Sequence, residues 1–182
     1  MLLIKIEDGE FWNEKKQEFF TIKGQVLQLE HSLVSISKWE SKWHKCFLST
    51  QTKTMEETID YVKCMTITQN VDPLLYKYSL TSKHLKTINQ YIDNPMSAKV
   101  FHKQEGKGHV NQDVTSEDIY YYMVAYQIPF ECQKWHFNRL MTLIKICNEK
   151  NSPEKSGMRR NEYARFRSKL NAARRAKFNT KG

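Results

Sequence analysis

The chain has 182 residues, of which 40% are hydrophobic and 27% are charged, with only 6 glycines and 4 prolines. This length fits one ordinary domain, with or without a tail, and this composition excludes collagen-like repeats and disfavours a chain that is disordered throughout. The net charge of +9 is confined to residues 155–182, because residues 1–154 hold 19 basic and 19 acidic side chains, and this excludes a protein that is basic along its whole length.

The first 30 residues predict a small antiparallel β-sheet. Apolar runs at residues 2–6, 18–22 and 25–29 are typical of short strands. Lys23-Gly24 separates the last two runs and fits the two-residue connection of a β-hairpin. We therefore expect two or three strands, with a hairpin that turns at Lys23-Gly24.

Two helices are predicted between residues 32 and 65. Apolar side chains recur every three to four positions over residues 32–46, which places Trp39 and Trp43 on one helical face. Thr54 and Glu57 have the spacing of a capping box at the start of a helix over residues 55–65. We interpret the neighbouring acids of this helix as parts of the cap and of a solvated face.

Caps also predict the next elements. Asp72-Pro73 is typical of a helix start and opens a short helical turn, and Thr81 or Ser82 begins a longer helix that ends before Pro95. Residues 94–114 are polar and predict a surface loop. Thr115 begins the next capped helix.

Tyr120, Tyr121 and Tyr122 belong to the helix that follows Thr115. Three consecutive aromatic side chains point around most of a helix, so they cannot all face one core, and at least one must face solvent or a partner. We therefore regard all three as candidate interface residues. The most apolar predicted helix then spans Glu131 to Glu149.

Residues 1–152 are expected to form a mostly helical domain of the α+β class, with an N-terminal antiparallel sheet followed by about five helices. Its predicted core includes large apolar side chains on the two strongest helical faces, namely Trp39, Trp43, Trp135, Leu140 and Ile144. Residues 153–182 are expected to form a separate basic arm, because they follow Ser152-Pro153 and carry all of the net charge.

The basic arm is predicted to be an amphipathic helix that ends near Asn179. An apolar stripe lies among arginines and lysines, and we expect both kinds of side chain to contact a partner. The candidate partner-binding residues are Arg159, Arg160, Tyr163, Arg165, Phe166, Arg167, Leu170, Arg174 and Arg175.

Catalytic and metal-binding motifs are missing from the sequence. It contains no G-x-S-x-G elbow, P-loop or G-x-G-x-x-G motif. Cys132 precedes His136 by four residues, but a zinc site needs three or four ligands and no second pair has matching spacing. We expect no enzymatic activity, no cofactor and no metal, and we expect the four cysteines to be reduced thiols in a cytosolic protein with no membrane span.

Eight short segments carry a resemblance to a known family. They are spread over nearly the whole chain: Leu29–Leu33, Trp39–Trp43, Asp60–Thr66, Asn70–Pro73, Asp93–Met96, Ile128–Glu131, Lys134–Leu140 and Leu170–Arg175. On these segments the chain resembles small proteins from the tail-gene cassettes of long-tailed bacteriophages and prophages, which are often called tail assembly chaperones.

The resemblance implies a non-enzymatic tail assembly factor that acts in the host cytoplasm during virion morphogenesis. Such a factor binds the tape measure protein, keeps its apolar surface from aggregating, and cooperates with tail tube subunits. Two other functions stay open at this point. One is a structural tail or connector component of the virion, and the other is a nucleic-acid-binding module that uses the basic arm. Self-association is a further open alternative.

Overall fold

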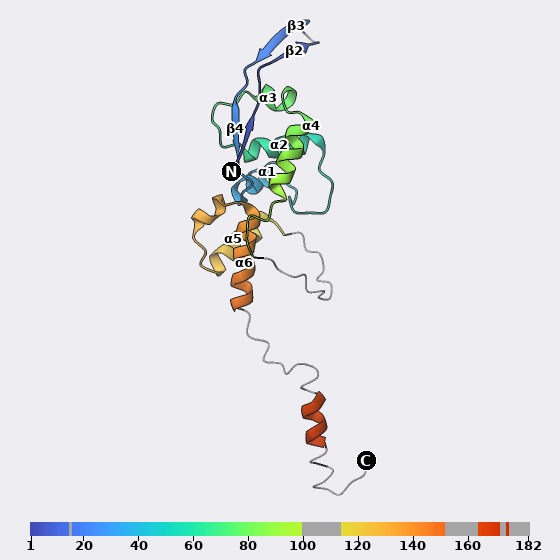
Figure 1. Cartoon of the computed structure of the whole chain (residues 1–182), viewed down its shortest axis with the longest axis vertical. Helices are drawn as coiled ribbons and strands as arrows, with labels where there is room; N and C mark the ends of the chain where they lie inside the picture. The colour runs from blue at the N-terminus through green and yellow to red at the C-terminus, as the bar shows by residue number, and fades with distance from the viewer. Residues whose placement is uncertain (15, 100–113, 152–163, 172–173, 175–182) are drawn as a thin grey trace. The chain divides into compact units, whose positions relative to one another are not determined.

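The computed structural model describes residues 1–14, 16–99, 114–151, 164–171 and 174. The chain divides into two units, Met1–Cys147 and Asn148–Gly182. The first unit begins with short antiparallel strands and continues with helices, so the predicted α+β, mostly helical fold is confirmed (Figure 1). Independent folding of residues 1–152 stays a prediction.

Four short strands form the N-terminal part: β1 (Leu2–Lys5), β2 (Gly9–Asn13), β3 (Glu18–Ile22) and β4 (Val26–Leu29). β1 pairs with β4 and β2 pairs with β3, both antiparallel, in two separate two-stranded sheets. The two sheets share one register, since Leu2 lies opposite Leu29 and Gly9 lies opposite Ile22. The four strands therefore follow one long hairpin that reverses direction between Asn13 and Glu18 (Figure 1).

The predicted hairpin turn at Lys23-Gly24 is wrong. Gly24 lies within the long hairpin, where a Cβ atom would be 2.3 Å from the carbonyl oxygen of Ile6 and 2.7 Å from the amide nitrogen of Asp8. The Gly24 amide instead donates a 2.7 Å hydrogen bond to Oδ1 of Asp8. Glycine is required here because two backbones approach closely, and not because the chain turns.

The first two helices agree closely with the sequence patterns. α1 spans Leu33–Trp43 and ends three residues earlier than expected, because His44 adopts a left-handed conformation with φ of 51°. α2 spans Met55–Met65, and both hydrogen bonds of the predicted capping box between Thr54 and Glu57 are present. The predicted start of α2 is confirmed.

Among the acidic side chains of α2, only Glu56 is exposed on the solvated face that we expected. Glu57 and Asp60 are buried against α1. Lys45 Nζ lies 2.5 Å from Oε1 of Glu57, and Asp60 accepts hydrogen bonds from Lys42 and from Nε1 of Trp43. The Lys45 hydrogen bond holds the pKa of Glu57 below its usual value. These acids are compatible with burial because each carboxylate has a charged partner.

The remaining predicted caps also occur in the structure. Asp72 caps α3 (Pro73–Tyr78), Thr81 caps α4 (Ser82–Ile92), and Thr115 precedes α5 (Ser116–Ala125). Residues 100–113 of the predicted loop lie outside the described residues.

The predicted helix from Glu131 to Glu149 is interrupted. A short 3₁₀ helix, η1, spans Phe130–Lys134, and α6 begins only at Phe137 and ends at Asn151. The break occurs where the chain pairs with a distant segment: Ser32 and His136 form an antiparallel bridge, and the Phe137 amide donates a 2.7 Å hydrogen bond to the His31 carbonyl. This long-range pairing overrides the helical spacing.

Trp135 is not a core residue, because it lies at this break and 37% of its surface is exposed. Trp39, Leu140 and Ile144 are buried in the core, and Trp43 is half-buried against it. None of the described helices combines the length and the apolar character that crossing a bilayer requires.

Candidate functional site

α5 is the strongest candidate for an interaction surface, and it is firmly anchored to the rest of its unit. Ile119 and Met123 on its inner side are completely buried. The amide of Ser116, at its first position, donates a hydrogen bond to Glu40 on α1. The Tyr120 hydroxyl donates a 2.9 Å hydrogen bond to Oε1 of Gln133 in η1. These contacts fix the orientation of the outer side of the helix.

The outer side of α5 is apolar and exposed. Tyr121 is 68% exposed, Val124 is 60% exposed, and Tyr122 is also exposed, whereas Tyr120 is half-buried. Tyr121 and Val124 lie three positions apart and therefore share a helical face. The Tyr121 and Tyr122 rings contact each other with their centroids 5.9 Å apart. We call Tyr121, Tyr122 and Val124 the α5 surface.

Exposed aromatic side chains continue beyond α5 along the chain. Phe130 in η1 is exposed, and Trp135 lies against Arg139, with the guanidinium carbon 4.5 Å from the ring centroid. This cation–π contact explains how Trp135 is held at the surface although it lacks a buried site. Aromatic side chains in such positions are typical of protein interfaces.

A second exposed pair lies near the end of the hairpin. Trp12 and Phe19 face each other across β2 and β3, their ring centroids are 4.8 Å apart, and both are exposed. On the other face, Phe11 and Phe20 pack against Tyr78 of α3. This pair was not predicted, because no strand was expected at the position of β2. The signal for it was the presence of aromatic residues at positions 11–12 and 19–20, which are typical of strands.

Within the predicted basic arm, the structure describes residues 164–171 and 174. Residues 164–171 are helical, and Arg165, Phe166, Arg167 and Leu170 are all exposed there. Arg174 is also helical and exposed. Arg159, Arg160, Tyr163 and Arg175, together with the predicted end near Asn179, lie outside the described residues. The spacing of Phe166 and Leu170 places both on one helical face, as the predicted stripe requires.

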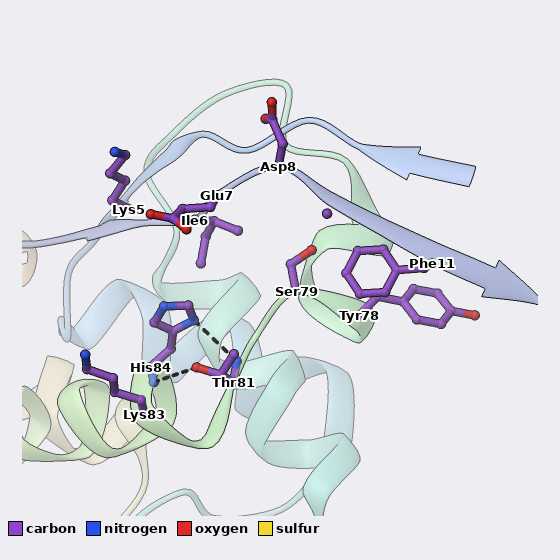
Figure 2. A pocket seen from close by; sticks show the side chains of 11 residues that line it. Lys5, Ile6, Glu7, Asp8, Phe11, Tyr78, Ser79, Thr81, Lys83 and His84 are labelled. Atoms are coloured by element: carbon purple, nitrogen blue, oxygen red, sulfur yellow. Dashed lines mark hydrogen bonds between the residues drawn. The ribbon is translucent and has the colours of Figure 1, made fainter. Parts of the chain in front are cut away.

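A cavity of about 530 Å³ lies between the N-terminal hairpin and the connection from α3 to α4 (Figure 2). Lys5 and Glu7 from the hairpin and His84 from α4 line its charged end, whereas Phe11 and Tyr78 lie at the other end. Thr81 and His84 are engaged with each other through the capping box of α4.

Histidine, cysteine and acidic side chains are the usual protein ligands of metal ions. Within the described part of the chain, no three histidine, cysteine or acidic side chains are grouped so that they could hold a metal ion. Cys132 and His136 do not share a helical face, because Cys132 lies in η1 and His136 in the bridge before α6. Burial raises the pKa of Cys132 and of Cys64, which disfavours the reactive thiolate.

His31 and His136 form a buried pair whose ring centroids are 5.1 Å apart. Nε2 of His136 lies 3.0 Å from the Tyr91 carbonyl oxygen, and Nδ1 accepts a hydrogen bond from the Asn138 amide. A carbonyl oxygen only accepts, so Nε2 carries the proton and the ring is neutral. Nδ1 of His31 lies 2.5 Å from the hydroxyl of Tyr61. These contacts give the pair a structural role between α2, α4 and α6.

Comparisons of the chain with protein-family models, with curated proteins and with solved structures found no significant match.

Proposed function

We propose that the protein is a non-enzymatic phage tail assembly factor that binds the tape measure protein, the tail tube protein or both. The observation that carries this proposal is the α5 surface, where Tyr121 and Val124 are exposed on a helix whose other side is completely buried. The resemblance of the sequence to tail assembly chaperones supplies the identity of the partner.

The α5 surface has the physical properties of a binding site for an apolar helix. Tyrosine side chains give a large contact area at a low cost in conformational entropy, and their hydroxyl groups keep the free surface compatible with water. The anchor between Glu40 and Ser116 holds α5 in place before binding, so little ordering is required when the partner arrives. A partner with an apolar surface would aggregate on its own and would be protected by this contact.

The basic arm contributes a second contact in this proposal. Phe166 and Leu170 supply apolar area, and Arg165 and Arg167 accelerate association with an acidic partner. Replacing Phe166 and Leu170 by serine should therefore abolish arm-dependent binding at every salt concentration. Replacing Arg165 and Arg167 by glutamine should mainly slow association and weaken its salt dependence. The reverse pattern would mean that the arm acts as a plain polycation, as nucleic-acid binding requires.

The test of the proposal is co-expression with a phage tape measure protein from the genome that encodes this chain. The tape measure protein should be insoluble alone, and it should become soluble and co-purify when this chain is present. Mass spectrometry of purified virions should find this chain absent or only in traces. Many copies in the virion would contradict an assembly factor and would identify a structural tail component instead.

A further inference from the structure

The cavity beside the N-terminal hairpin has unpaired main-chain groups on one wall. The long hairpin is interrupted between β1 and β2, and the last regular contact there is the 3.0 Å hydrogen bond from the Ile6 amide to the Gln25 carbonyl. Within the described residues, the main-chain groups of Glu7 and Asp8 have no backbone hydrogen bond. Asp8 uses its carboxylate, rather than its main chain, to bond Gly24.

Lys5 adds a further pair of open groups to this wall. Ile6 is bonded to β4, and antiparallel pairing alternates, so the amide and carbonyl of Lys5 point away from β4. The other strand shows the same alternation, because the Gln28 amide points away from β1 and bonds the Thr68 hydroxyl. Glu7 follows the same alternation as Lys5, and both residues line the cavity, whereas the main chain of Asp8 faces the other strand near Gly24. This wall is therefore the open edge of a strand.

The opposite wall contains a buried hydroxyl group without a partner. Ser79, at the end of α3, is only 9% exposed, and its Oγ atom forms no hydrogen bond with any of the residues that the structure describes. Figure 2 shows this hydroxyl directed across the cavity toward the hairpin. Leaving a buried hydroxyl unpaired costs free energy, so its presence calls for an explanation.

We propose that this cavity binds an extended polypeptide segment, which pairs through its main chain with the open edge at Lys5 and Glu7 and contacts the Ser79 hydroxyl on its other side. A volume of about 530 Å³ accommodates a short segment. Addition of a strand to an open edge is an established mode of peptide recognition, in which main-chain hydrogen bonds supply the affinity. The site goes beyond the tail assembly proposal and does not depend on it.

The two ends of the cavity define which side chains fit the segment. Phe11 and Tyr78 offer aromatic contact to an apolar side chain. Lys5, Glu7 and Lys83 lie at the charged end, where side chains of both signs can hydrogen-bond to an uncharged hydroxyl or amide side chain. The expected ligand is therefore an uncharged segment that alternates between apolar and polar residues, as strands do.

The probe for this site is the blocked pentapeptide acetyl-Thr-Val-Thr-Val-Thr-amide. It is titrated into the isotope-labelled full chain up to about 1 mM, because binding with a millimolar dissociation constant is detectable at that concentration. Its matched control has the same side chains but methyl groups on the amide nitrogens of alternate residues. Amide resonances of Lys5 and Glu7 should shift with the unmodified peptide only. No shift, equal shifts with the methylated peptide, or shifts confined to other regions would each overturn the proposal.

Ser79→Ala separates ligand binding from folding. The free variant should be as stable as the wild type or more stable, because an unpaired hydroxyl is removed. Its affinity for the pentapeptide should fall about three- to tenfold, which is the change expected when one hydrogen bond is lost. Ser41→Ala, at an exposed position on α1, should leave the affinity unchanged. Unchanged affinity in Ser79→Ala would remove this hydroxyl from the site and contradict the proposed geometry.

Discussion

The amide of Ser116, the first residue of α5, donates a 2.8 Å hydrogen bond to Oε2 of Glu40 on α1. The other oxygen of the same carboxylate accepts a 2.7 Å hydrogen bond from the Phe47 amide. Glu40 and Ser116 are both buried. The Glu40 carboxylate therefore holds both the segment after α1 and the helix that carries the α5 surface. Its place at the start of α5 is favourable, because a helix N-terminus attracts an acidic group.

Glu40→Gln should lower the free energy of unfolding by about 2 kcal/mol, because the neutral amide has only one accepting oxygen for the two buried amides. Urea denaturation of the full chain measures this change. Glu10→Gln, at an exposed position of β2, is the control and should change stability by less than about 0.5 kcal/mol. Equal stabilities of the two variants would show that Glu40 does not anchor α5.

The buried histidine pair predicts a loss of stability in mild acid. Burial, with a smaller contribution from His136, lowers the pKa of His31 to about 3, and burial also lowers the pKa of His136. Below the ordinary pKa of 6.5 the unfolded chain therefore binds more protons than the folded chain. Stability is complete above pH 6.5 and decreases as the pH falls below it, by up to about 1.4 kcal/mol per pH unit for each histidine.

His136→Gln tests this interpretation, because the glutamine amide can still donate to the Tyr91 carbonyl but does not titrate. Denaturant unfolding between pH 6.5 and about pH 5 should show roughly half of the wild-type pH dependence in this variant. This range lies above the pH at which ordinary carboxylates are protonated. An unchanged slope would mean that other groups cause the acid sensitivity.

Trp135 and Leu140 should differ sharply in their effect on stability. Leu140 is completely buried, so Leu140→Ala should lower the free energy of unfolding by about 2–5 kcal/mol. Trp135→Ala removes an exposed ring and its contact with Arg139, and it should cost about 1 kcal/mol or less. Thermal unfolding of the two variants makes the comparison. A larger loss of stability for Trp135→Ala than for Leu140→Ala would show that Trp135 is a core residue.

Gly24→Ala should destabilise the hairpin by about 2 kcal/mol, because the added methyl group would overlap backbone atoms of Ile6 and Asp8. Gly9→Ala is the matched control. Its Cβ atom would approach only the ring of Phe11, a side chain that can move away. Circular dichroism during denaturation compares the two variants, and equal effects would contradict the close backbone approach at Gly24.

Local chemistry explains which elements could be predicted from the sequence. The caps at Thr54, Asp72, Thr81 and Thr115 involve residues within a few positions of each other, and each of them precedes a helix in the structure. Such contacts depend on sequence spacing and hardly on the rest of the fold. The exposure of Tyr121 and Tyr122 likewise follows from the fact that a helix has only one side toward the core.

Long-range pairing explains the errors. Lys23-Gly24 has the composition of a turn, but only the approach of Ile6 and Asp8 reveals why glycine is needed there. The break before α6 depends on a bridge to Ser32, more than 100 positions earlier in the sequence. The exposure of Trp135 follows from this bridge, so periodicity within one segment could not predict it.

The most direct test of the central claim is co-purification of the tape measure protein with Tyr121→Ser/Val124→Ser. This double variant removes the two most exposed side chains of the α5 surface and leaves the buried residues Ile119 and Met123 in place. Met55→Ser, which changes an exposed apolar residue at the start of α2, is the control, and thermal unfolding verifies that both variants are folded. The account predicts at least about a tenfold loss of bound tape measure protein for the double variant alone. Wild-type recovery with the folded double variant would contradict it.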